Sequence, residues 1–126
     1  MIDFSQVITK EEIDKEAQVL VKARIADRRY LAETGGILVN DMQIDTGRDS
    51  QAMITGAALS ALIDDTYVCR WKTPTGFVTL NASTLLSVSQ AMRRHVQACF
   101  DREDELVTAV SDGTFTDAML EEGWPA

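Results

Sequence analysis

Residues 35–44 read GGILVNDMQI, and this stretch decides which class of fold the chain can form. It holds two short apolar runs, 37–39 and 42–44, on either side of Asn40 and Asp41. Asparagine and aspartate tolerate the left-handed backbone that a two-residue hairpin turn requires, so the pattern predicts a β-hairpin. The paired glycines just before it are typical of a helix end. The hairpin is therefore expected to follow directly on a helix.

The segment upstream of the glycines is predicted to form one long amphipathic helix. Residues 9–12, Thr-Lys-Glu-Glu, have the form of a capping box, in which the threonine oxygen and the glutamate side chain satisfy free backbone N–H groups. Apolar residues then recur at three- and four-residue steps, and the helix is expected to reach about Ala32. They are Ile13, Ala17, Leu20, Val21 and Ile25. Such a helix is about 35 Å long, about as long as a small domain is wide, so part of it could project.

This apolar stripe leaves two roles open for the helix. It is narrow and does not sustain three a/d heptads, so packing on the rest of the domain is favoured over a coiled coil. A projecting helix that docks or oligomerises is the alternative. The chain is therefore expected to have two parts. Residues 1–32 form an N-terminal amphipathic helix for docking or oligomerisation. Residues 33–126 form a compact α+β domain with a short C-terminal helix and tail.

Downstream of the first hairpin the sequence predicts a second helix and a second hairpin. Asp49 or Ser50 could cap the helix, whose apolar face is rich in alanine and is expected to be largely buried. Residues 67–72 and 77–80 are rich in β-branched and aromatic side chains around a Thr-Pro-Thr-Gly turn. Strand alternation places Tyr67, Cys69 and Trp71 on one face, and Val68, Arg70 and Lys72 on the other.

A third and longest helix follows, with Asn81 or Ser83 as its cap. The charged run 101–105 is expected to form a solvated segment, after which apolar residues resume until Gly113. A short helix over about 116–122 ends the chain. The order of elements predicts an α+β fold: a small antiparallel sheet of two β-hairpins packed with helices, preceded by the long N-terminal amphipathic helix.

Composition limits the classes of function. With 126 residues, 45% of them hydrophobic and 25% charged, the chain fits one globular domain. Its formal net charge of −8 disfavours nucleic-acid binding, because that affinity depends largely on Lys and Arg at phosphates. The short basic runs Arg28-Arg29 and Arg93-Arg94-His95 are more often solvated surface. No stretch approaches the ~20 apolar residues of a membrane span, so we expect no membrane insertion and a cytosolic protein.

Few residues could carry chemistry. A metal site needs several converging ligands, and the chain has a single histidine, His95. His95 and Cys99 are four residues apart on one predicted helix, but a working thiolate also needs an electropositive pocket and an oxyanion hole. A packed cysteine beside a surface histidine is the favoured interpretation, and Cys69 is likewise expected to be a free thiol. No phosphate-binding motif surrounds Gly35-Gly36, so we expect no cofactor, no metal and no enzymatic activity.

Large aromatic side chains are the clearest candidates for protein contact. Trp71 lies in the second hairpin and is interpreted as core or interface. Trp124 lies in the C-terminal tail, where it either forms an interface or folds back on the body. With the stripe of the first helix they make up the predicted protein-interface set, which is Ile13, Ala17, Leu20, Ile25, Trp71 and Trp124.

Several fragments, taken in their order along the chain, resemble a known family. They are residues 33–37 (ETGGI), 48–52 (RDSQA), 71–72 (WK), 76–82 (GFVTLNA) and 95–103 (HVQACFDRE). The combination is similar to the signature of the phage and prophage domain-of-unknown-function family 4376, and it covers about residues 28–106. The chain departs from the family pattern at Gly47, where an Asp is common, and at Asn40-Asp41, where the turn often contains a Gly.

The resemblance implies a structural role without catalytic residues. Family members stand near tail genes in tailed-phage genomes, alone or attached to tail and tail-fibre proteins. We expect Arg48 to pair with a carboxylate and Gln51 to bond to the backbone of the first hairpin. The full structural signature, expected to shape backbone at turns and helix starts, is Gly35, Gly36, Arg48, Ser50, Gln51 and His95.

The function expected on this basis is that of a tail or tail-fibre associated structural or assembly protein of a bacteriophage or prophage. It would act through contacts with other phage tail proteins or with copies of itself, as a homo-oligomer. It would be found in the host cytoplasm during assembly and in the virion tail. The first residues, Ile2–Ser5, also resemble the start of small tail-associated proteins. The alternative is a small phage protein that binds and regulates or inhibits a host protein in the cytosol.

Overall fold

The computed structural model describes residues 9–126, and residues 1–8, which include the Ile2–Ser5 opening, lie outside the described part. Helices alternate with two β-hairpins along the chain, which confirms the predicted α+β class. The elements are α1 (Lys10–Glu33), β1 (Ile37–Val39), β2 (Met42–Ile44), α2 (Arg48–Ile63), β3 (Val68–Thr73), β4 (Gly76–Asn81), α3 (Ala82–Asp112) and the 3-10 helix η2 (Asp117–Glu121).

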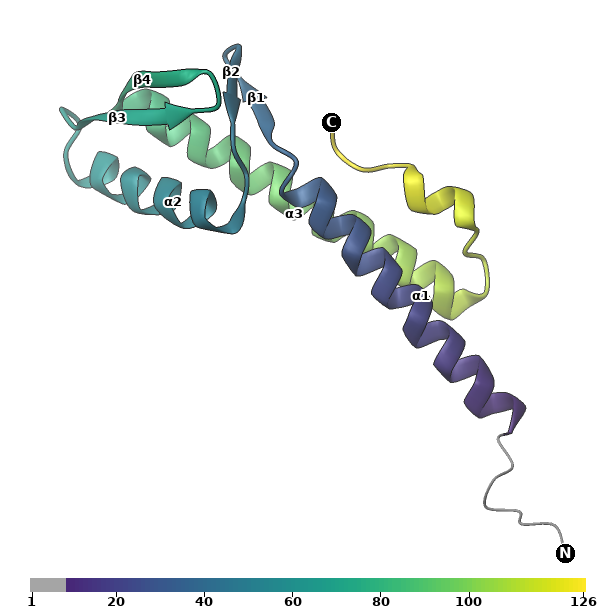
Figure 1. Cartoon of the computed structure of the whole chain (residues 1–126). Helices are drawn as coiled ribbons and strands as arrows, with labels where there is room; N and C mark the ends of the chain where they lie inside the picture. Colours follow the sequence, from purple (N-terminus) through teal and green to yellow (C-terminus); the bar gives the residue numbers. More distant parts are fainter. Residues whose placement is uncertain (1–8) are drawn as a thin grey trace, which may run out of the picture.

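The helices α1 and α3 form the long axis of the molecule (Figure 1). They lie side by side in opposite directions, while α2 and both hairpins gather around the first half of α3. The first turns of α1 continue past the end of α3, and Ile13 there is 52% exposed. Ile25, in the second half of the helix, is fully buried. The two roles left open for this helix are thus divided along its length: its second half packs and its first turns project.

The capping box predicted for α1 is confirmed. The Thr9 hydroxyl accepts from the Glu12 backbone N–H at 3.1 Å, and the Glu12 carboxylate accepts from the Thr9 N–H at 3.3 Å. The helix ends at Glu33, one residue beyond the predicted end. Gly36 follows with a φ of +91°, a left-handed conformation that glycine adopts without strain.

Both hairpins form with the predicted turns. In the first, Ile37 pairs with Ile44 and Val39 with Met42, and the turn residues Asn40 and Asp41 have left-handed φ angles of 49° and 64°. In the second, pairing runs from Val68 with Asn81 to Thr73 with Gly76. Each strand pairs only with its hairpin partner, so the two hairpins make two separate two-stranded sheets.

Two expectations about α2 are wrong. The helix begins at Arg48 behind Gly47, without a side-chain cap from Asp49 or Ser50. It is also not largely buried, because only the face toward α3 is covered. The buried residues of that face are Ile54, Ala58 and Ala61, while Met53, Leu59, Leu62 and Ile63 are exposed.

The helix α3 is continuous through the charged run 101–105, which was expected to form a solvated segment. Arg102 and Glu103 are half-buried, because they bind the C-terminal tail and Arg29. Asn81 caps the helix as predicted, and its side chain accepts from the Thr84 N–H at 2.9 Å. Gly113, with a φ of +76°, ends it. The buried apolar residues of α3 that line the core include Leu85, Val88, Met92, Val96, Cys99 and Leu106.

Candidate functional site

Two of the polar signature residues, Arg48 and Gln51, meet around one buried carboxylate, Glu33, at the junction of α1, the first hairpin and α2. Glu33 lies in the last turn of α1 and its side chain is 0% exposed. Arg48, in the first turn of α2, contacts both of its carboxylate oxygens. Arg29, one helical turn earlier on α1, donates to Oε1, and Gln51 Nε2 donates to Oε2 at 2.8 Å. One acid therefore ties α1 to α2 through charge-assisted hydrogen bonds.

The first hairpin is tied to the same junction through Thr46, which is also fully buried. Its hydroxyl donates to the Glu33 carbonyl at 2.6 Å and accepts from the Gly36 N–H at 2.9 Å. Gln51 Nε2 also donates to the Thr46 carbonyl at 2.9 Å. The expected pairing of Arg48 with a carboxylate is thus observed, whereas Gln51 bonds to the backbone of Thr46, two residues beyond the end of the first hairpin.

The charge of Glu33 is stabilised by its neighbours. Burial alone would raise the pKa of its carboxyl, but hydrogen bonds from Gln51, Arg48 and Arg29 outweigh burial, and its pKa is lowered. A buried carboxylate that stays charged and is fully paired has no lone pair or proton to offer a substrate. The junction is therefore built to hold three elements together rather than to transfer protons.

Arg29 extends this network to the second half of α3. Its Nε donates to Glu103 Oε1 at 3.0 Å, and its guanidinium lies 4.4 Å from the centre of the Phe100 ring. This cation–π contact covers a ring that is otherwise partly exposed. Arg29 is consequently a structural residue and does not form a free basic patch with Arg28.

The pair His95 and Cys99 makes the predicted contact, with Cys99 Sγ 3.9 Å from His95 Nε2. The expectation of a surface histidine is wrong, because His95 is buried and its Nε2 lies 2.9 Å from the Ala32 carbonyl, to which it donates in the tautomer that carries the proton there. Burial raises the pKa of Cys99 to about 11, and the nearby charge of Glu33 adds to the shift. A thiol held in this state is a poor nucleophile at neutral pH.

We expect the two thiols to differ in their reactivity toward iodoacetamide. Cys99 is fully buried, whereas Cys69 is half-buried, although burial raises its pKa too. In the folded protein at pH 8, mass spectrometry after a short reaction should find the label on Cys69 and almost none on Cys99. In denaturant both should react. Equal labelling in the folded protein would contradict the packing of Cys99.

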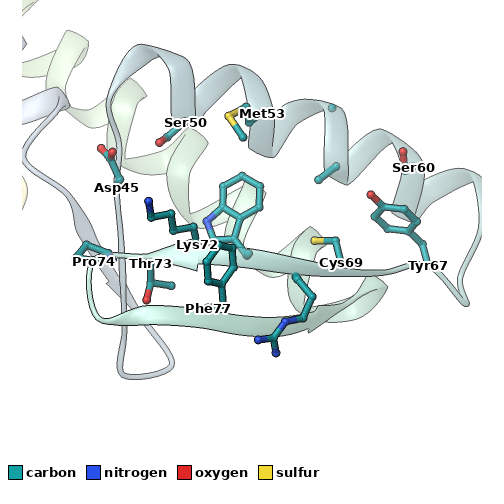
Figure 2. Close-up of a pocket in the computed structure, with 14 residues that line it drawn as sticks. Asp45, Ser50, Met53, Ser60, Tyr67, Cys69, Lys72, Thr73, Pro74 and Phe77 are labelled. Carbon is teal, nitrogen blue, oxygen red and sulfur yellow. The ribbon is translucent and has the colours of Figure 1, made fainter.

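A groove of about 800 Å³ lies between α2 and β3 (Figure 2). Met53 and Tyr67 give it apolar walls, and Trp71 connects it with the core beneath. On the α2 side Gly56 and Ala57 keep it open, because they have little or no side chain to fill it. The groove has one acidic residue, Asp45, and two basic ones, Arg70 and Lys72. It has the shape of a binding surface and lacks paired catalytic groups.

Replacing Gly56 with alanine should stabilise the protein. Gly56 lies in the interior of α2, and a Cβ added there meets no atom within 4 Å. Alanine lowers the conformational entropy of the unfolded chain and favours helix, so Gly56→Ala should raise the free energy of unfolding by about 0.5–1 kcal/mol. Urea denaturation followed by circular dichroism measures this. A loss of stability would show that the glycine has a packing role in α2 that the structure does not show.

The predicted interface residues separate into two groups. Ile13, Ala17 and Leu20 lie exposed on the first half of α1, and Leu20 is 68% exposed. Ile25 is in the core and is not part of the surface, and Trp71 packs on both core clusters from the edge of the groove. On the apolar stripe of α1, Ile25 therefore belongs to the core, and Ile13, Ala17 and Leu20 belong to the surface.

Trp124 folds back on the body, which decides between its two predicted roles. Its indole Nε1 donates to the Leu120 carbonyl at 2.7 Å, and Arg28 lies 5.3 Å from the ring centre. Arg28 also pairs with Glu121 at 3.1 Å, and Arg102 donates to the Glu122 carbonyl at 2.8 Å. The C-terminal tail is thus held by arginines from α1 and α3.

The remaining signature residues have separate positions. Gly35 and Gly36 form the turn after α1, and a Cβ at Gly36 would lie 2.5 Å from Gln43 Nε2. Ser50 lines the groove rather than the junction. The two residues that sequence reasoning did not single out are Glu33 and Thr46, which occupy the centre of the junction. An arginine exactly one helical turn before Glu33 was the available signal for a local ion pair.

Most of the chain matches a known protein family. The model described as "Domain of unknown function (DUF4376)" matches residues 16–122, which include the whole junction and the whole groove. The chain belongs to this family. The DUF4376 match begins inside α1, so the projecting first turns of the helix lie outside it. No curated protein and no solved structure matches the chain.

Two classes of feature are absent from the part of this DUF4376 protein that the structure describes. Residues 9–126 contain no group of three or more His, Cys, Asp or Glu side chains placed to hold a metal ion. None of the described helices is long and apolar enough to cross a bilayer. The Asp64 carboxylate accepts from the N–H and the hydroxyl of Thr66 at its own turn.

Proposed function

We propose that this protein acts by protein–protein contact, as a tail or tail-fibre associated structural or assembly component of a bacteriophage or prophage. The observation that supports contact as its mode of action is the exposed apolar surface on the first half of α1. Ile13, Val19 and Leu20 are each more than half exposed there, whereas Ile25, further along the same helix, is fully buried. Single exposed apolar residues are common, but three in the first half of one helix favour a docking surface.

The link to tails comes from the sequence signature and its resemblance to phage proteins. The protein's chemistry is compatible with this role. Glu33 and Arg29 form hydrogen bonds that fix α1 on the rest of the domain. A partner bound to the first half of α1 would therefore be held at a fixed position relative to the domain. A rigid arm of this kind suits an assembly component.

Photo-crosslinking in cells that produce the phage or prophage tests this proposal. A photoreactive amino acid placed at Leu20 should form a cross-link to a tail or tail-fibre protein, identified by mass spectrometry. The same amino acid at Gln90, an exposed position on α3, is the matched control and should form none. Purified particles or assembly extracts should contain the protein. If the chain is absent from both and Leu20 is cross-linked only to a host protein, the tail proposal is wrong and a host-directed role replaces it.

A truncation that starts near Arg28 would not test the same idea. It removes Ile25, which is fully buried, so any loss of binding could reflect unfolding. Leu20→Asp is a better variant, because it adds a charge at an exposed position and leaves the core intact. We expect it to lower the yield of the cross-linked partner complex while the melting temperature stays within a few degrees.

A further inference from the structure

The groove between α2 and β3 has an unpaired strand along one side. β3 pairs only with β4, so within residues 9–126 no strand lies along its other edge. The groove follows this edge, since residues 69–73 of β3 line it in succession but Phe77 alone does so from β4. Figure 2 shows α2 and β3 on either side of the groove, with β4 beyond β3. A free edge beside a groove is the arrangement that binds an extended peptide by strand addition.

The two faces that an added strand would meet differ in chemistry. Side chains of a strand alternate between the faces of its sheet. On one face they would lie beside Cys69 and Trp71, next to Met53 of α2. On the other they would lie beside Arg70 and Lys72, neither of which pairs with a carboxylate of the described residues. The complementary peptide therefore alternates apolar and acidic or small polar side chains.

Residues 2–5 of this chain read Ile-Asp-Phe-Ser, which is such an alternation. We propose that residues 2–8 of a second copy add as a strand to the free edge of β3. Ile2 and Phe4 enter the apolar side of the groove, and Asp3 lies on the face of Arg70 and Lys72. This inference shares one premise with the proposed function, namely that the protein acts by binding other protein chains.

The groove of the same chain is out of reach of these residues. They precede Thr9, which caps the far end of α1, and the 24 residues of α1 span about 36 Å. The seven residues 2–8 span at most about 25 Å when fully extended. In Figure 1 the start of α1 points away from α2 and β3. Residues 2–8 can therefore reach this groove only from a second copy.

This contact joins unlike surfaces, the N-terminal segment of one copy and the groove of the next. Such head-to-tail contacts close into rings or continue as open chains. The two cations also make the edge selective, because they favour an acidic strand and oppose a basic one. Lys72 on an otherwise free edge hinders unspecific strand pairing as well.

Light scattering coupled to size-exclusion chromatography, over a dilution series of the full chain, tests the proposal. The wild type should associate, and Phe4→Asp should weaken association by about thirtyfold, because it removes the apolar anchor. Gly56→Trp should also abolish association by filling the groove, whereas Gly56→Ala, its matched control, should leave association unchanged. A Cβ at position 56 meets no atom within 4 Å, and circular dichroism verifies that the tryptophan variant is folded.

A charge exchange shows whether the contact runs between copies. Asp3→Lys and Lys72→Asp should each weaken self-association by about fivefold. Mixing the two variants should restore it, because each segment then meets a groove of opposite charge. A wild type that is monomeric at every attainable concentration overturns the proposal. So does association that Phe4→Asp and Gly56→Trp leave intact. The cross-link at Leu20 does not involve the groove, so this inference and the proposed function can fail separately.

Discussion

Glu33→Ala is expected to lower the free energy of unfolding by about 3 kcal/mol, one of the two largest effects of a single substitution in this protein. The change leaves Arg29 and Gln51 without their acceptor in a partly buried site. We place the value at the lower end of the range for broken buried pairs, because the Arg48 side chain is 56% exposed and water can solvate it. Urea denaturation at pH 7 measures the loss.

Glu16→Ala provides the control on the same helix. Glu16 is exposed and makes no ion pair within the described chain, so its replacement should change the free energy of unfolding by no more than about 0.5 kcal/mol. If Glu33→Ala and Glu16→Ala gave equal small changes, the junction would not be the anchor that its geometry indicates.

The effect of Glu33 should also depend on pH in a defined direction. Its pKa is lower in the folded protein than in the unfolded chain, so the stability it contributes is fully present above the unfolded value of about 4.3. That stability is lost as the pH falls through the folded pKa. The difference in stability between wild type and Glu33→Gln should therefore be largest near neutrality and shrink in acid. A difference that grows as the pH falls would contradict the lowered pKa.

Ile25→Ala is expected to have an effect of similar size, a loss of about 2–5 kcal/mol. Ile25 is the one fully buried apolar residue of α1, and its truncation leaves a cavity between α1 and the body as well as removing apolar contact. Thermal unfolding followed by circular dichroism, together with urea denaturation, measures the change.

Leu20→Ala on the same helix is the matched control for Ile25→Ala. Leu20 is predominantly exposed, so its truncation should leave the free energy of unfolding within about 0.5 kcal/mol of the wild type. The pair of variants separates the part of the apolar stripe that serves the fold from the part that is free for a partner. Similar losses for both would mean that the first half of α1 also packs in solution.

The residues of the junction illustrate how far sequence reasoning reaches. Arg48 was expected to pair with a carboxylate, but nothing in the sequence identified that partner as Glu33. The two residues are 15 positions apart, and they meet only because the hairpin returns the chain to the end of α1. Thr46 is equally inconspicuous in the sequence, since a threonine beside a turn is ordinary.

The burial of α2 was also predicted only in part, because it too depends on contacts with elements far away in the sequence. The helical spacing of Ile54, Ala58 and Ala61 was visible in the sequence, and these residues are buried. Leu62, which comes directly after Ala61, is exposed, because no element of residues 9–126 covers that side of α2. How wide a helix face becomes buried depends on its neighbours, which the local pattern does not specify.

Local chemistry by itself determined the elements of this protein. The capping box at Thr9, the left-handed turn at Asn40 and Asp41 and the asparagine cap at Asn81 each act within a few residues, and periodicity of apolar residues located the helices. Only the tertiary structure decided that Glu33 is buried among two arginines and a glutamine, that Ile25 is core while Leu20 on the same stripe is exposed, and that β3 keeps a free edge beside a groove. These features depend on contacts between residues far apart in the chain. The sequence alone does not specify them, because hydrophobic burial is not directional and does not select one set of distant partners.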